Sequence, residues 1–322
     1  MGRLLKRVLP KRVYNYIHLR RHPMPMNLTD KEREAGLAAL YRQKTGKELD
    51  FSNLRSFPEK LQWYKLYYDH PDLSEIVCKY GFKRYIEKKL GKGHTVPLIG
   101  AWKRVEDIPW NELPDRFVLK SNCQSDGNFI RFIKNKNEVD FEPLKEELAN
   151  WLKPKKTLIN SYCRAYYNVT PMILAEEYLE SVQDQLVDYK LFCFGGKPDL
   201  FYAGSNHFHY LEDGTLDYTV TFYDTEWNKK DYVYGNHRVV DIPKPEHLDE
   251  MMKYANVLAK EFPFVRVDFF DTPDKLYVAE LTFYPGGGFA SYSNELDSAW
   301  GKMLVLPEKS PLGRKFRTDL NY

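Results

Sequence analysis

The sequence has few of the features that mark specialised classes of protein. Only four of its 322 residues are cysteines, and none forms the CxxC spacing of a zinc site or part of a disulfide framework. Such sparse, unpaired cysteines are typical of reduced cytoplasmic proteins. No apolar run approaches the roughly 20 residues of a membrane span. The net charge of +3 is too small to indicate nucleic-acid binding.

Positive charge is concentrated at the start of the chain. Residues 1–29 hold seven lysines or arginines and no acid, in an amphipathic pattern with Leu4, Leu5, Val8 and Leu9. This basic leader could lie on an anionic membrane surface, or it could be a solvated helix packed on the body of the protein. It lacks the sustained apolar core of a secretory signal. We expect a cytoplasmic protein, with peripheral contact to the inner face of the membrane as an open alternative.

The chain is long enough for two or three lobes with their own cores. Its first hundred residues have mainly helical patterns, and we expect helices over 30–44, 58–69 and 73–90. Short strands and turns follow, which indicates an α+β chain built largely from antiparallel hairpins. The expected domains are a basic leader (1–29), a helical region (30–112), a small lobe (113–180) and a large lobe (181–322).

The most informative segment covers residues 264–289, FVRVDFFDTPDKLYVAELTFYPGGGF. Two apolar runs joined by a turn read as strands, and each carries one acid, Asp268 or Glu280. A carboxylate among apolar neighbours is costly unless it is paired. Two of them on adjacent strands suggest a shared Mg²⁺, which takes hard oxygen ligands and substrate phosphates. Arg266 shares a strand face with Asp268, so a hairpin with a simple ion pair is the alternative.

Further motifs point to a nucleotide. Glycines 286–288 directly follow the second acidic strand, where backbone N–H groups could approach an anion. Lys120 ends an earlier strand, and its ammonium could neutralise a phosphate or simply be a surface charge. The run LAEEYL over residues 174–179 places two acids at a strand end whose backbone could read an adenine edge. Asp188 opens the next strand and offers a carboxylate to a ribose hydroxyl.

The order of these features resembles the ATP-grasp superfamily. It looks most like the TupA-like branch, which is associated with teichuronopeptide, capsule and other bacterial surface-glycan synthesis. The resemblance spans about residues 57–307 and is carried by FPEKLQWYKLYYD, KYGFKRYI, FVLKSN, LAEEYL, DYKLFCFGGKP, FVRVDFF and YVAELTFYPGGGF. It implies an ATP-grasp fold, with mixed or antiparallel sheets in two lobes and a helical N-terminal region.

The resemblance also implies a role for each matching residue. The nucleotide-binding residues would be Lys79, Lys120, Ser125, Gly127, Glu176, Glu177, Leu179, Asp188 and Lys190. The lysines at 79 and 120 would contact phosphates under a flap formed by 122–128. Glu176 would hold adenine, together with the backbone of Glu177 and Leu179.

The same resemblance implies a metal site and a set of catalytic groups. Asp268, Glu280 and Thr282 would ligate Mg²⁺. Arg266 and Lys120 would stabilise the transferred phosphate, and the N–H of Gly287 would face the oxyanion of an acyl intermediate.

Three positions depart from the pattern of this branch. Cys78 stands where an Asp usually precedes the first lysine. The flap contains Asp126, whose charge would repel ATP phosphates unless it points away or meets a cation. Thr282 stands where many members have an Asn that also binds the metal.

The implied reaction is amide ligation that uses ATP and Mg²⁺. ATP would phosphorylate a carboxylate, and an amine would then attack the acyl-phosphate and release phosphate. The expected partners are a sugar or nucleotide-linked sugar and an amino acid, in capsular or other surface-polysaccharide synthesis, with a homodimer as a further expectation. Two alternatives stay open: a sugar or glycan kinase on the same scaffold, and a non-catalytic binding subunit that keeps the fold.

Overall fold

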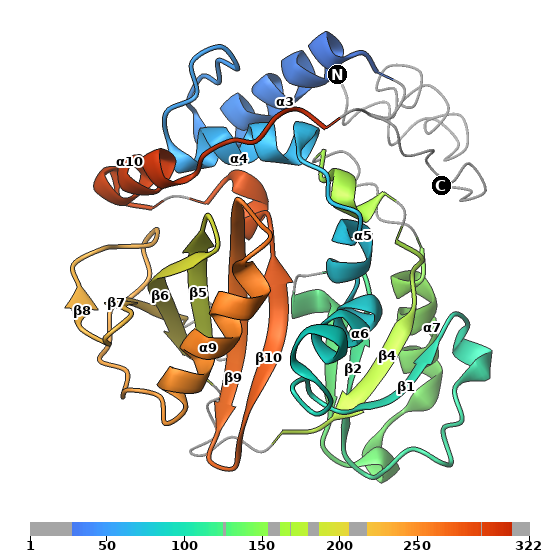
Figure 1. Cartoon of the computed structure of the whole chain (residues 1–322). Coiled ribbons are helices and arrows are strands. Elements are labelled where there is room, and N and C mark those ends of the chain that lie inside the picture. Colours follow the sequence, from blue (N-terminus) through green and yellow to red (C-terminus); the bar gives the residue numbers. More distant parts are fainter. Residues whose placement is uncertain are drawn as a thin grey trace.

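Two antiparallel sheets form the framework of the computed structural model, shown in Figure 1. The structure describes residues 28–124, 127–153, 162–167, 169–179, 187–205, 218–290 and 292–310. The smaller sheet has the strand order β1-β4-β2-β3, and the larger has the order β10-β9-β5-β6-β7-β8. All neighbouring strands in both sheets pair antiparallel, which confirms the α+β expectation of two hairpin-rich lobes.

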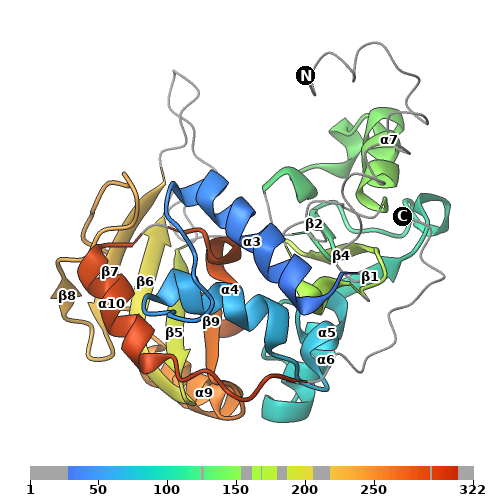
Figure 2. The same cartoon turned by 90° about the horizontal axis from the view of Figure 1, so that it is seen from above.

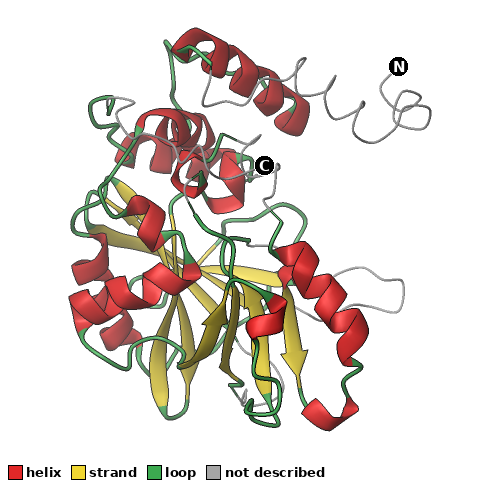
Figure 3. Ribbon diagram, turned by 90° about the vertical axis from the view of Figure 1, so that its right-hand side faces the viewer, coloured by secondary structure: helices red, strands yellow, loops and turns green. Residues whose placement is uncertain are grey.

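The strands of the smaller sheet are β1 Leu98–Trp102, β2 Phe117–Ser121, β3 Ile130–Ile133 and β4 Ile173–Glu177. Those of the larger sheet are β5 Asp188–Phe194, β6 Lys197–Ser205, β7 Thr219–Asp224, β8 Lys229–Lys230, β9 Phe264–Thr272 and β10 Lys275–Thr282. The α-helices are α3 Asp30–Thr45, α4 Phe57–Tyr67, α5 Leu73–Ile76, α6 Lys79–Leu90, α7 Phe141–Trp151, α9 Leu248–Ala259 and α10 Asn294–Met303. Figure 3 shows how helices flank both groups of strands.

Local capping signals fix the first helices. Thr29 and Glu32 form a capping box at the start of α3, and Gly46 ends the helix in a left-handed conformation. A second capping box, between Ser56 and Glu59, starts α4. These helices match the ranges predicted from the sequence to within a few residues. No helix in the described part of the chain is both long and apolar enough to span a membrane.

The prediction of a single helix over 73–90 is wrong, because the chain forms two. Between α5 and α6, Cys78 takes an extended conformation with φ −89° and ψ 115°. The cause lies elsewhere in the fold, since Asn122 supplies hydrogen-bond acceptors to the N–H groups of Lys79 and Tyr80. The break gives α6 its own N-terminus beside the end of β2.

The smaller sheet has its own hydrophobic core. Leu144, Leu148 and Trp151 of α7 pack with Phe117 and Leu119 of β2. Because side chains alternate along a strand, Lys120 points to the opposite face of this sheet. One face of the sheet is therefore buried against α7, and the opposite face carries the polar side chain of Lys120.

The larger sheet is covered by aromatic residues of helices that precede and follow it in the chain. Phe57 of α4 meets Phe192 and Phe264 edge-on, and Trp300 of α10 stacks on Phe192 with ring centroids 4.3 Å apart. Seen from above in Figure 2, α4 and α10 lie over the same lobe. Helix α9 packs against β5, β6 and β9. The N-terminal helices thus belong to the core of the large lobe.

One buried carboxyl in this packing stands out. Asp297 of α10 is buried, and its Oδ1 has no hydrogen-bond partner among the described residues. Burial, followed by the nearby charge of Glu59 against the opposing charge of Lys47, raises the pKa of Asp297 to about 7. An ionised Asp297 is therefore a cost to folding at neutral pH and above.

We predict that Asp297→Asn raises the melting temperature by a few degrees at pH 8. Because the folded state binds the Asp297 proton more tightly than the unfolded chain, wild-type stability falls as pH rises from about 4 to about 7. The advantage of the variant should therefore disappear near pH 4. Thermal unfolding across this range measures the effect. Glu295→Gln, at an exposed position of the same helix, is the control. An equal gain there would show that the effect is not specific to the buried carboxyl.

Candidate functional site

The pairing of β9 with β10 brings the predicted metal ligands together. Val278 stands opposite Phe269, but Glu280 stands opposite Asp268, so the register shifts by one residue at Ala279, as in a β-bulge. Without this shift Glu280 would point to the other face of the sheet. The N–H of Val278 instead donates to the carbonyl of His94 at 2.7 Å. The shift therefore puts both carboxylates side by side on one face.

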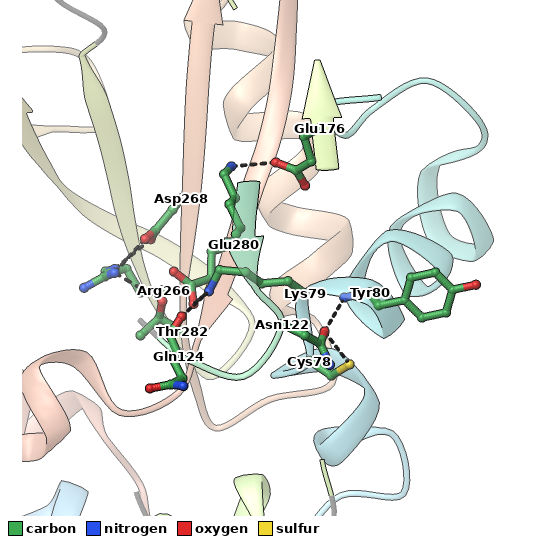
Figure 4. A network of polar contacts seen from close by, with 11 residues as sticks. Cys78, Lys79, Tyr80, Asn122, Gln124, Glu176, Arg266, Asp268, Glu280 and Thr282 are labelled. Carbon is green, nitrogen blue, oxygen red and sulfur yellow. Dashed lines mark hydrogen bonds and ion pairs between the residues drawn. The ribbon is translucent and has the colours of Figure 1, made fainter. Parts of the chain in front are cut away.

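Arg266 forms a tight ion pair with Asp268. Its Nε and Nη2 each donate to a carboxylate oxygen at 2.6 Å, and Nη2 also donates to Thr282 Oγ1 at 3.1 Å. Figure 4 shows these side chains beside Glu280. Burial opposes the charge on the guanidinium, yet the Asp268 carboxylate raises the pKa of Arg266. Burial raises the pKa of Asp268, against the opposing charge of Arg266.

The residues fit a magnesium ion held together with a phosphate. Asp268 and Glu280 offer hard oxygen ligands from paired positions, and a carboxylate that accepts from Arg266 keeps lone pairs for a cation. No group of three or more His, Cys, Asp or Glu side chains in the described residues is arranged to hold a metal. Two protein carboxylates are the donor set that Mg²⁺ uses when phosphates complete its shell. Thr282 lies in the same group, with its hydroxyl accepting from Arg266.

Lys79 connects α6 to this carboxylate pair. Its Nζ lies 3.9 Å from Glu280 Oε1 and donates to the backbone carbonyl of Gln124 at 3.1 Å. Gln124 follows β2, so the lysine bridges the end of the small sheet and β10 of the large one (Figure 4). The first predicted lysine is therefore placed against the predicted metal site.

A second charge cluster lies on the inner face of the small sheet. Glu176 is 5% exposed and accepts from Lys120 at 2.5 Å and from Lys83 at 2.7 Å. Burial alone would raise the pKa of Glu176, but the two ammonium groups outweigh it and hold the pKa at about 2. The carboxylate predicted to read adenine is thus engaged by two lysines in this structure.

Lys190 and Asp188 lie at the start of β5. Their side chains pair at 2.7 Å, and Lys190 stands directly opposite Asp268 in the β5–β9 register. Burial opposes the charge on Lys190, but Asp188 and then Asp268 raise its pKa. Both predicted nucleotide contacts therefore share the face that carries the metal ligands.

The strand end predicted to read a base lies beside Lys120 and Glu176. The backbone N–H of Glu177 donates to the carbonyl of Pro97 at 3.1 Å, while its side chain is exposed. Leu179 follows β4 and is partly buried. Phe132, 44% exposed on β3, stands opposite Val118 and so shares the face of Lys120. An exposed aromatic ring on this face is a surface on which a base could stack.

The glycine run forms a tight turn over Pro285–Gly288, in which Gly286 and Gly287 do not have right-handed helical dihedral angles. Gly286, Gly287 and Gly288 all have positive φ, which only glycine adopts at no steric cost. The N–H of Gly287 donates to the carbonyl of Tyr284 at 2.8 Å. In this conformation the predicted oxyanion donor is therefore engaged within the turn.

Two fully buried polar side chains of α4 hold the carbonyls of this turn. Lys65 Nζ donates to Gly287 at 2.8 Å, and Gln62 Nε2 donates to Gly288 at 2.5 Å. Three residues apart, they share one face of the helix. Lys65 also lies over the ring of Phe289 at 4.2 Å, and no carboxylate among the described residues pairs with it. Burial lowers the pKa of Lys65 to about 8.

Some predicted features lie outside the described residues. Ser125 and Asp126 of the flap are among them, while Gly127 opens the 3₁₀ turn Gly127–Phe129 ahead of β3. Of the basic leader, only Leu28 and Thr29 are described, so contact with a membrane stays a prediction.

The structure thus gathers most of the predicted site residues around the two sheets and adds others. Lys83, Asn122, Gln62 and Lys65 take part in the polar network but were not singled out from the sequence. Lys83 lies one helical turn after Lys79, so the spacing was an available signal. The other three depend on contacts between segments far apart in the chain.

Comparisons with known proteins agree with the resemblance seen in the motifs. A family model described as TupA-like ATPgrasp matches residues 59–305. None of the curated protein sequences is similar enough to count as a match.

Several solved structures are similar to part of the chain. D-alanine–D-alanine ligase from Bacillus anthracis is 17% identical, over 71% of this chain and 64% of that one, with a TM-score of 0.42. D-alanyl-alanine synthetase A from Vibrio cholerae is 12% identical over 68% and 59%, with a TM-score of 0.41. ATP-grasp ligase PsnB, complexed with a precursor variant, Mg and ADP, is 10% identical over 74% and 60%, with a TM-score of 0.41. This chain spans less than two thirds of the length of each of them.

We predict that Glu176→Gln destabilises the protein by about 3 kcal/mol at pH 7, because it leaves two partly buried ammonium groups without their counter-charge. A folded-state pKa near 2 means that this stabilisation is complete above the unfolded value near 4.5 and is lost as pH falls towards 2. Denaturant unfolding at pH 7 and pH 3 should therefore show a smaller difference at the lower pH. Glu177→Gln, next in sequence but exposed, should have little effect at either pH.

We also predict that Lys65→Met changes stability little at pH 7, because removing a buried ammonium offsets the lost bond to Gly287. Since the folded state disfavours the charged lysine, wild-type stability should gain a contribution between about pH 8 and pH 10.5. The variant should lack that gain, which unfolding at pH 7.5 and pH 10 would reveal. Lys60→Met on the same helix is the control, since its ammonium donates to Leu304 from a partly exposed site. Parallel pH profiles for all three proteins would contradict this account.

Proposed function

The chain belongs to the TupA-like ATP-grasp family, and we propose that it is an ATP- and Mg²⁺-dependent carboxylate–amine ligase. One observation carries the proposal: Asp268 and Glu280 stand directly opposite each other on β9 and β10, next to Arg266. Lys79, from the other side of the site, lies 3.9 Å from the carboxylate of Glu280. A pair of acids surrounded by cations is what a metal–phosphate group requires.

The charges of the site suit the meeting of two anions. A substrate carboxylate and the γ-phosphate of ATP repel each other, so their approach needs compensating positive charge. Lys79 and Arg266 supply it at the carboxylate pair, and Lys120 supplies it from the small sheet. Lys120 is held by Glu176 until a phosphate competes for it, which keeps the ammonium in place without a ligand.

The reaction proceeds in two displacements. An oxygen of the substrate carboxylate attacks the γ-phosphorus, the bond to the β–γ bridging oxygen breaks, and ADP leaves. The amine nitrogen then attacks the acyl carbon, phosphate leaves with the acyl oxygen, and the nitrogen loses a proton. Water must be excluded while the acyl-phosphate exists. Lys79 contacts both the end of β2 in the small sheet and Glu280 in the large sheet, and this close approach of the two sheets would help to keep water out.

Asp268 and Glu280 would hold the magnesium ion, and Thr282 would assist them. When bound, the ion would neutralise charge on the phosphates. Arg266, already positioned by Asp268, would face the phosphate being transferred. Asp188 and Lys190 would lie towards the nucleotide on the same face.

The glycine turn would contribute to the second displacement. Gly287 stays the predicted oxyanion donor, and its N–H becomes available only if the bond to the Tyr284 carbonyl opens. Glycines with positive φ can make that change without a steric penalty. Lys65 and Gln62 would keep the turn attached to α4 while it does so.

The substrate class rests on the family alone. We propose that the amine or amino acid is joined to a uronic acid or another sugar carboxylate, in capsular or other surface-polysaccharide synthesis. A cytoplasmic location and a homodimer belong to the same proposal, as does contact of the basic leader with the inner face of the membrane. The resemblance of the motifs to the TupA-like branch supports this choice.

A product assay separates the candidate functions. The protein is incubated with Mg-ATP, pooled amino acids and nucleotide-linked uronic acids and aminosugars, and ADP, AMP and phosphate are quantified. Equal amounts of ADP and phosphate that depend on both a carboxylate and an amine support the ligase. ADP without free phosphate indicates a kinase, and AMP contradicts acyl-phosphate chemistry. A protein that does not bind Mg-ATP is a non-catalytic relative.

We predict that Asp268→Asn lowers the rate of ADP formation at least 100-fold. The amide keeps the size of the side chain but removes the charge that holds Arg266 and would hold the metal. Steady-state assays at saturating ATP with increasing Mg²⁺ measure the loss. Asp274→Asn, at the exposed turn between the same two strands, is the control and should retain activity. An Asp268→Asn protein with normal turnover would show that the metal site has been assigned wrongly.

A further inference from the structure

Helix α6 begins with a weak capping residue. Cys78 occupies the N-cap, where Ser, Thr, Asp or Asn is preferred. Its Sγ accepts from the N–H of Gly81 at 3.4 Å, and a thiol is a weak acceptor. A helix that starts in the protein interior needs partners for all of its first four N–H groups. Cys78 alone does not supply them.

Asn122 supplies the missing acceptors from a distant part of the chain. Its backbone carbonyl accepts from the N–H of Lys79 at 3.1 Å, and its Oδ1 accepts from the N–H of Tyr80 at 2.9 Å. The same Oδ1 accepts from the thiol of Cys78 at 3.0 Å. The N–H of Cys78 itself donates to the carbonyl of Glu75 at 3.2 Å, so the four N–H groups from Cys78 to Gly81, which have no acceptor within α6, are all satisfied.

Asn122 is itself fixed on its other side. Its Nδ2 donates to the carbonyl of Thr170 at 2.9 Å, and its backbone N–H donates to Met172 at 2.9 Å. Asn122 is 1% exposed, so its side-chain amide cannot turn to hydrogen-bond with water instead. Because the amide donates to Thr170, the carbonyl oxygen must face α6 (Figure 4).

This arrangement determines how α6 can meet an anion. Free N–H groups at a helix N-terminus often bind phosphate directly. Here those groups are occupied by protein acceptors, so the first turn of α6 presents its positive charge through the ammonium of Lys79. Asn122 follows Lys120 of β2 by two residues. Because Asn122 caps α6, it fixes the position of Lys79 relative to Lys120.

We propose that Asn122 is a positioning residue that caps α6 from β2 and thereby holds Lys79 in place for the phosphates of the nucleotide. The proposal rests on the proposed ATP site for its consequence, but the cap itself does not. Asn122 does for this chain what a capping side chain at position 78 would otherwise do.

Two measurements test the proposal. Hydrogen–deuterium exchange of the segment 79–90 reports the cap, and titration with Mg-ATP reports the position of Lys79. In Asn122→Ala, the first turn of α6 should lose protection and the Kd for Mg-ATP should rise about tenfold, the factor that one lost hydrogen bond of this kind gives. Ser121→Ala, the neighbouring buried residue, should leave both unchanged.

Rescue and non-additivity distinguish positioning from general loss of structure. Adding Cys78→Ser to Asn122→Ala provides a capping hydroxyl in the helix itself and should restore protection and most of the affinity. Lys79→Met should weaken Mg-ATP binding in the wild type but add little in the Asn122→Ala background. Full additivity of the two losses, or a failure of Cys78→Ser to restore anything, would overturn the proposal.

A further variant covers the case in which Asn122→Ala does not fold. Asn122→Asp keeps an acceptor for Tyr80, but it replaces the amide that donates to Thr170 with a carboxylate oxygen and buries a charge. Overall stability should therefore fall, while the first turn of α6 should stay protected in the folded protein, because a negative charge is favourable at a helix N-terminus. Loss of protection in that variant would overturn the cap. If the wild type itself does not bind Mg-ATP, the proposed function fails, while the exchange data still decide whether Asn122 caps α6.

Discussion

The one-residue register shift at Ala279 is the constraint on which the site depends. It turns Glu280 onto the face that already carries Asp268 and Arg266. Just before the shift, the N–H of Val278 on this edge strand donates to the carbonyl of His94 outside the sheet. A regular hairpin with the same residues would leave one acid on each face of the sheet. Two isolated carboxylates would each need a separate partner, whereas two on one face can share a cation and be offset by the same nearby bases.

Pairs of opposite charge then link α6 to both sheets. Helix α6 carries Lys79 to Glu280 and Lys83, one turn later, to Glu176. One helix therefore serves a carboxylate on each sheet, and its position is set at its start by Asn122. Four further residues hold these groups in place without being expected to meet a ligand, namely Lys83, Asn122, Gln62 and Lys65. Such support is what keeps charged side chains in a defined geometry before a ligand arrives.

The sequence was a good guide wherever the cause of a structure is local. Helical patterns located α3 and α4, and apolar runs bounded by turns located the strands that carry Asp268 and Lys120. It failed where the cause is distant, as at Cys78, where apolar spacing continues through a break that Asn122 imposes. The register shift had a trace in the sequence, because the large aliphatic residues of β10 fall at 276, 278 and then 281, which breaks the alternation of a regular strand. The hydrogen bond from Lys65 to the carbonyl of Gly287 had no such trace in the sequence, since it joins residues 222 positions apart.

That separation has a consequence for how the chain is made. Helix α4 is complete early in synthesis, yet the carbonyls that satisfy Gln62 and Lys65 emerge from the ribosome only after more than 200 further residues. Until then the ammonium of Lys65 and the amide of Gln62 can hydrogen-bond only to water. The face of α4 that carries them therefore cannot become buried. Contacts between residues so far apart in sequence give the large lobe a high contact order, so we expect the N-terminal helices and the large sheet to fold together and late. The smaller sheet with α7 has its own core and is free to form first.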